Sequence, residues 1–172
     1  LIMPAIIRHY VRIVDRISSY VGHVAMFLIF AMIAILLLDA VTRNVIKMPL
    51  HWCIELAQFT LTAYYFMGGP YSLIGGAHVR MDIVYSHLTS RGQIWMDIAT
   101  IGCLMFYLAV MLAGSISSLQ YALKTGERRF SMWNPSMIPI KALMAACLVL
   151  MLLQAFSLLF KYIASLRGVE LK

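Results

Sequence analysis

Five histidines are the first residues of this sequence that suggest chemistry, because a pair of them could bind haem. They are His9, His23, His51, His78 and His87. In a bundle of membrane helices, both axial ligands of a haem iron would come from facing helices. Only His23 lies inside an expected span, and His51 lies at the mouth of another, on the opposite membrane face in the expected topology. The sequence therefore predicts no haem and no other cofactor.

A carboxylate within a hydrophobic stretch is the second candidate for chemistry. Glu55 lies about four residues inside the expected second span, where an unpaired charge is costly. Arg43 lies twelve residues earlier, across a short loop that contains Pro49. We expect an Arg43–Glu55 ion pair that holds the first two spans together. The alternative, a proton or ion relay, would need more ionisable groups inside the membrane than this sequence has.

The sequence contains no motif typical of an enzyme. A P-loop, a GxGxxG, a nucleophile elbow and a metal-binding HExxH are all missing. The cysteines Cys53, Cys103 and Cys147 form no Cys-x-x-Cys motif and lie in or beside apolar stretches, where a free thiol behaves as a small hydrophobic group. We expect neither an enzyme nor a metal site.

The composition indicates what kind of protein positions these residues. Of 172 residues, 62% are hydrophobic and 12% are charged, whereas soluble domains carry roughly 25% charged residues. We therefore expect an all-α integral membrane protein. The net charge of +7 does not indicate nucleic-acid binding, because Lys and Arg lie at the ends of hydrophobic runs, where lipid phosphates attract them.

Hydrophobic stretches long enough to cross a bilayer make up more than half of the chain. We expect four transmembrane helices within one membrane domain, residues 1–172, at residues 21–38, 50–71, 94–123 and 138–163. The third is long enough that it should tilt or protrude. The run Gly68-Gly69-Pro70 permits a break near one end of the second. Transporters place such breaks in matching pairs at mid-membrane, so we interpret this single one as structural.

The segment before the first span, residues 4–20, has one charged face and one apolar face. Arg8, Arg12 and Arg16 recur every four residues and so share one side of a helix. We expect an N-terminal amphipathic interfacial helix whose arginines contact lipid headgroups. The alternative is a charged cytoplasmic extension of the first span.

The distribution of Lys and Arg predicts the orientation of the chain. With four spans, both termini share one side with residues 72–93, and that side carries eight Lys and Arg against six on the other. The N-terminal cluster usually weighs most in the positive-inside rule, so both termini should be cytoplasmic. The loop at residues 124–137 then lies on the outer side.

Short motifs in a fixed order run from the end of the first span to the loop after the second. They are an Arg, a Pro-Trp loop, a Glu-Leu pair, a Gly and a His-(Val/Ile)-x-x-Asp signature: Arg43, Pro49, Trp52, Glu55, Leu56, Gly69, His78, Val79 and Asp82. This order resembles the small membrane subunit (Q, or DctQ-like) of tripartite ATP-independent periplasmic (TRAP) transporters. Two positions depart from the family: Ile54 replaces a frequent acidic residue, which leaves Glu55 alone, and Pro70 follows where a small residue is usual.

The resemblance implies an accessory subunit in a bacterial inner membrane. In such transporters a large membrane subunit carries the sodium and substrate sites, a periplasmic binding protein delivers an organic acid, and the small subunit braces the large one. The residues expected at the subunit interface, or in a structural pair, are Arg43, Trp52, Glu55, Leu56, Gly69, His78 and Asp82.

The loop between the third and fourth spans is the expected docking site for the binding protein. It presents Arg128, Arg129 and Trp133. Two alternatives from other classes are the membrane anchor of a respiratory enzyme and a small stand-alone multidrug exporter. The first would need the haem ligands discussed above, and the second a carboxylate deep in a span, whereas Glu55 lies near the end of its span.

Overall fold

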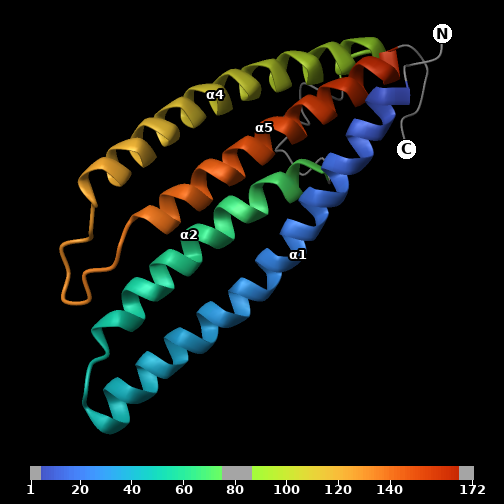
Figure 1. Ribbon diagram of the computed structural model, residues 1–172. Coiled ribbons are helices and arrows are strands. Elements are labelled where there is room, and N and C mark those ends of the chain that lie inside the picture. Colours follow the sequence, from blue (N-terminus) through green and yellow to red (C-terminus); the bar gives the residue numbers. More distant parts are fainter. Residues whose placement is uncertain (1–4, 75–86, 167–172) are drawn as a thin grey trace.

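The computed structural model describes residues 5–74 and 87–166 of the chain. Within these residues the fold consists of long helices (Figure 1). They are α1 (Ala5–Val41), the short π-helix η1 (Thr42–Ile46), α2 (His51–Ile74), α4 (Ser90–Thr125) and α5 (Ile138–Leu166). The described residues form no β-strand, only an isolated bridge between Arg128 and Ser136. The prediction of an all-α fold is confirmed.

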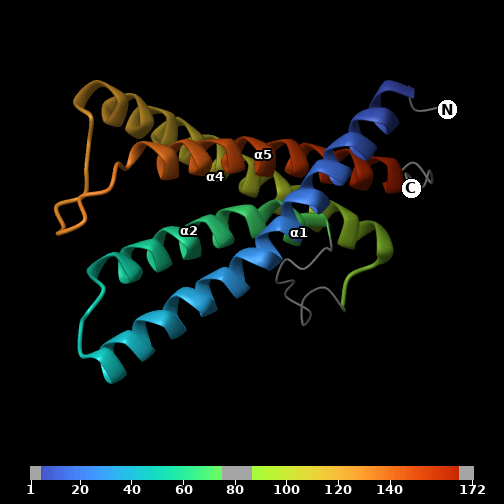
Figure 2. The same ribbon diagram turned by 60° about the horizontal axis from the view of Figure 1, so that its bottom comes forward.

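The four long helices lie side by side in the order α4, α5, α2, α1 (Figure 1). α5 packs on both α4 and α2, and α2 packs on α1. The N-terminal part of α1 also crosses the C-terminal part of α5, as Figure 2 shows. α2 and α5 therefore have neighbours on two sides, whereas α4 forms an outer edge.

The contact between α4 and α5 is a narrow apolar seam. On α4 the buried residues recur every seven positions: Ile101, Leu108, Ser115 and Ala122. This spacing keeps one line of side chains facing a neighbouring helix. Leu108 packs in a buried cluster with Leu148 and Ala155 of α5. Leu104, Met105 and Leu112 of α4 pack against this cluster. The outer side of α4 remains uncovered by the described helices, as Phe106 with 74% of its surface exposed illustrates.

The N-terminal segment is not a separate interfacial helix, and that prediction is wrong. α1 runs without interruption from Ala5 to Val41 and so joins residues 4–20 to the first expected span. Val11, Val14 and Ser18 are buried, and this part of α1 forms hydrogen bonds with α5. Because one face of the segment packs on protein, the helix continues the first span, as the alternative interpretation had it.

The structure also corrects the expected break in the second span. α2 continues as a helix through Gly68, Gly69 and Pro70 to Ile74. Among the described residues, α1 together with η1, α4 and α5 are long and apolar enough to cross a membrane, but α2 does not meet this criterion. Its 24 residues still give it a length of about 36 Å, against about 30 Å for the hydrocarbon core of a bilayer. Composition, and not length, sets α2 apart.

Candidate subunit interface

The expected ion pair between Arg43 and Glu55 is not formed. Arg43 lies in η1 and its Nη2 donates to Oδ2 of Asp39, at 3.0 Å and four residues earlier on the same helical stretch. Side chains at this spacing are neighbours on a helix surface, so the local carboxylate binds the guanidinium. Glu55 is 8% exposed, and its Oε2 has no hydrogen-bond partner among the described residues.

A polar network between α1 and α5 was missed by the sequence reasoning. The carboxylate of Asp15 accepts hydrogen bonds from Nζ of Lys161 at 2.5 Å and from Nε2 of Gln154 at 2.7 Å. Ser18 donates to Oε1 of Gln154 at 2.9 Å, and both of these residues are fully buried. A glutamine in the apolar middle of α5 was the signal that could have revealed it, because a buried amide needs partners.

The other residues expected at the subunit interface lie apart from one another. Trp52 is 37% exposed at the start of α2, and Leu56, one turn later, is half-buried. Gly69 contacts α5: a Cβ placed on it would lie 2.7 Å from Sδ of Met151. His78 and Asp82 lie outside the described residues. The structure therefore gives Gly69 a role within this chain, in helix packing.

The arginines expected to contact lipid headgroups, Arg8, Arg12 and Arg16, are all exposed on α1. They flank the face of α1 that packs on α5, where Val11 and Val14 are buried. This placement leaves their side chains free to reach a headgroup layer.

The loop between α4 and α5 is held in a defined shape by its own backbone. Gly126 adopts a left-handed conformation at the end of α4, with φ of +61°, and its N–H donates to the carbonyl of Ala122. The N–H of Arg129 donates to the carbonyl of Pro135 at 3.1 Å. Glu127 in turn forms an ion pair with Lys141 at the start of α5. The loop therefore presents its side chains from a fixed frame.

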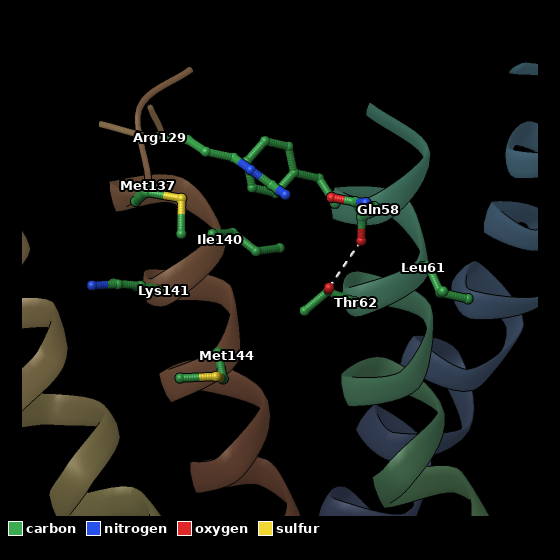
Figure 3. Close-up of a pocket in the computed structure, with 9 residues that line it drawn as sticks. Gln58, Leu61, Thr62, Arg129, Met137, Ile140, Lys141 and Met144 are labelled. Carbon is green, nitrogen blue, oxygen red and sulfur yellow. Dashed lines mark hydrogen bonds between the residues drawn. The ribbon is translucent and has the colours of Figure 1, made fainter. Parts of the chain in front are cut away.

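The residues expected to dock the binding protein point in different directions. Arg128 is exposed, and Trp133 at the loop tip is 45% exposed. Arg129 is half-buried and lines a cavity of about 470 Å³ between α2 and α5. In Figure 3 its guanidinium extends from the loop toward Gln58 of α2, whereas Lys141 points away from the cavity.

This cavity combines a cationic mouth with an apolar floor. Polar groups come from Gln58, Thr62 and Arg129, together with Lys141, which is paired with Glu127. The apolar lining residues are Phe59, Leu61, Met137, Ile140 and Met144. The hydroxyl of Thr62 donates to the backbone carbonyl of Gln58 at 2.9 Å, so the Gln58 amide keeps its own hydrogen-bonding groups (Figure 3). Such a site suits an acidic or amide-bearing group attached to an apolar body.

Comparison with known proteins identifies the family. Residues 32–164, from the second half of α1 to the last turn of α5, match the family model for the DctQ component of the tripartite ATP-independent periplasmic transporters. A search of curated proteins gave no match. This family is a membrane component of a transporter and not an enzyme, which confirms the prediction that the chain is not an enzyme and favours neither a respiratory anchor nor an exporter. The chain belongs to the DctQ family and is a multi-pass membrane component of a TRAP transporter, a complex with a large membrane subunit and a periplasmic binding protein.

Proposed function

We propose that this chain braces the large membrane subunit of its transporter during sodium-coupled uptake of an organic acid. The family match carries this proposal, since it makes the chain one component of a larger assembly. The surface supports it. Large apolar side chains remain exposed along all four long helices, among them Phe27 at 72%, Tyr65 at 67% and Phe106 at 74%. Part of this surface is available for the large subunit.

The described helices offer no site of the kind that binds ions in transporters. Such sites lie at mid-membrane between paired broken helices, whereas α1, α2, α4 and α5 run without a break at their centres. The acidic residue packed between α1 and α5, Asp15, already holds Lys161 and Gln154. This supports the proposal that sodium and substrate bind in the large subunit.

We also propose that α2 is the fourth span and that both termini are cytoplasmic. α1 and α2 run antiparallel and pack along each other (Figure 1), so a chain that crosses with α1 returns with α2. The loop between α4 and α5 then lies on the periplasmic side, where a binding protein approaches.

The test is uptake into sealed vesicles that contain the large subunit with or without this chain. With the periplasmic binding protein outside and an inward sodium gradient, labelled organic acids are offered one at a time. We expect uptake only when both membrane subunits are present, and co-purification of the two in a fixed ratio. Full uptake without this chain would refute the bracing role.

We propose further that Arg128 and Trp133 contact the binding protein directly. Arg129, which is half-buried in the cavity between α2 and α5, does not. Arg128→Glu should raise the concentration of binding protein needed for half-maximal uptake, because it reverses an exposed charge. Lys47→Glu is the matched control, an exposed basic residue in the other loop at this end of the chain. Equal effects of the two substitutions would show that only the net charge of this side matters.

A further inference from the structure

We infer that the large membrane subunit packs on one face of α2. This face, named here the α2 docking face, consists of Ile54, Gln58, Leu61, Tyr65, Gly68 and Ser72. The inference rests on the proposed function and deepens it, because it assigns the surface that the brace uses.

The rest of the chain covers the α2 docking face only in part: Ile54, Gln58 and Tyr65 are exposed, and Leu61, Gly68 and Ser72 are half-buried. Its members follow one another at intervals of three and four residues, so they form a single line along the helix. On the flank toward α1, Cys53 is fully buried and Ala57 is 7% exposed. On the flank toward α5, Phe66 packs against the buried cluster of Leu108, Leu148 and Ala155. Between these flanks Tyr65 is 67% exposed.

The chemistry of this face suits protein better than lipid. The side chains of Gln58 and Tyr65 form no hydrogen bond with any described residue, and Gln58 is exposed. A polar group left unpaired in hydrocarbon costs several kcal/mol, whereas polar side chains between transmembrane helices bind one another. The opposite side of α2 is mostly apolar, with Leu56, Ala63, Met67 and Ile74. The hydroxyl of Thr60 at its margin donates to the carbonyl of Leu56 and so has its hydrogen bond within the helix. A partner on the docking face also explains why α2, unlike α1, α4 and α5, has no continuous stretch apolar enough to be a candidate span.

Gly68 marks the point of closest approach on this face. A Cβ placed on Gly68 would meet nothing within 4 Å, in contrast to its neighbour Gly69, whose Cβ would collide with Met151. Glycine inside a helix is about 1 kcal/mol less favourable than alanine, and small residues let the backbones of two membrane helices approach. Gly69 serves the contact with α5, so Gly68 is free to serve a contact outside the chain.

The cavity beneath Arg129 continues the docking face at its periplasmic end. Gln58 and Leu61 belong to the docking face and also line this cavity. Arg129 forms no ion pair with any described residue, and its guanidinium points toward Gln58 (Figure 3). We expect the partner helix to place a carboxylate or an amide here, which both groups can bind.

Three glycine substitutions test the assignment, since Gly68, Gly102 and Gly114 all have open space where a side chain would grow. Gly68→Leu should lower the amount of this chain that co-purifies with the tagged large subunit at least about tenfold, the effect of losing about 1.4 kcal/mol. Gly102→Leu and Gly114→Leu on α4 should leave co-purification unchanged. Each variant chain, purified alone, should be at least as thermally stable as the unaltered chain, because leucine favours the helix more than glycine does.

A photo-crosslinking amino acid supplies an independent readout. At Tyr65 it should give a crosslink to the large subunit, and at Tyr107 of α4, which is 57% exposed, it should not. Crosslinks from Tyr107 but not Tyr65, or lipid adducts alone at Tyr65, would overturn the inference and leave the bracing role standing. If the unaltered chain fails to co-purify with the large subunit, the bracing role itself fails.

Discussion

At the scale of single residues, the contact between α1 and α5 depends on polar side chains that satisfy one another. Gln154 accepts from Ser18 and donates to Asp15, and Asp15 also holds Lys161. The hydroxyl of Tyr10 adds a hydrogen bond to the carbonyl of Leu153 at 3.0 Å. A buried donor or acceptor left without a partner destabilises the protein by more than one hydrogen bond stabilises it. The network therefore favours this one arrangement of α1 on α5, because other arrangements would leave buried groups unpaired.

Gln154→Leu tests this contact. The substitution keeps the volume of the side chain but leaves the Ser18 hydroxyl without its acceptor and Asp15 with fewer donors, so we expect a loss of about 1–3 kcal/mol of unfolding free energy. Thermal unfolding in detergent measures the change. Gln120→Leu, at an exposed position of α4, is the matched control and should unfold at the temperature of the unaltered chain. Equal stability of both variants would show that the network contributes nothing.

At the scale of helices, two glycines allow α2 to pack closely on its neighbours. A Cβ at Gly22 would lie 2.5 Å from Cγ of Tyr71 and so would collide with the side chain that packs over α1 at this point. A Cβ at Gly69 would lie 2.7 Å from Sδ of Met151 on α5. The ring is rigid and the methionine side chain is flexible, so the contact at Gly22 tolerates an added methyl group less well.

Alanine substitutions at three glycines should therefore change the unfolding free energy in different directions. Gly102 has open space, so Gly102→Ala should raise the unfolding free energy by up to about 1 kcal/mol through helix propensity. Gly22→Ala should lower it in spite of the same gain, because the Tyr71 ring must move away. The change in unfolding free energy caused by Gly69→Ala should lie between those of Gly102→Ala and Gly22→Ala. Chemical unfolding in mixed micelles measures all three, and a uniform increase would show that no close contact exists at Gly22.

At the scale of the whole molecule, the four long helices form an open layer and not a closed bundle (Figures 1 and 2). α4 is attached along one seam, and α1 crosses α5 at one end only. A single layer leaves large areas of helix surface without a neighbour, as the exposed Phe27 and Phe106 illustrate. This shape is consistent with the proposed role as a brace, because the uncovered surface can pack along a larger subunit.

The orientation of the layer in the membrane can be tested with single cysteines. In a Cys103→Ser background, which removes the exposed native thiol, Arg128→Cys should react with a membrane-impermeant reagent in cells whose outer membrane is permeable. Arg16→Cys, exposed on α1, should react only after the inner membrane is opened. The reverse pattern would place both termini outside the cytoplasm and would remove the α4–α5 loop from the docking surface.

The helical class, three of the spans and the family follow from the amino-acid sequence alone. These features depend on local composition and on the order of short motifs, and both can be read along the chain. The expected spans at 94–123 and 138–163 lie within α4 and α5, and the family match covers residues 32–164. The position of Arg8, Arg12 and Arg16 on one side of α1 likewise follows from their spacing, because residues four apart lie on the same side of a helix.

The contacts between distant residues, in contrast, depend on how the helices pack. Asp15 and Lys161 are 146 positions apart. The sequence around each residue does not indicate that α1 and α5 cross at this point. The same packing holds α1 as one helix through its charged segment. Arg43 pairs with Asp39 one turn away, and Glu55 is left buried, with its Oε2 lacking a hydrogen-bond partner among the described residues. The packing also distinguishes Gly68 from Gly69, adjacent letters in the sequence, because only one of them faces a neighbouring helix of the chain.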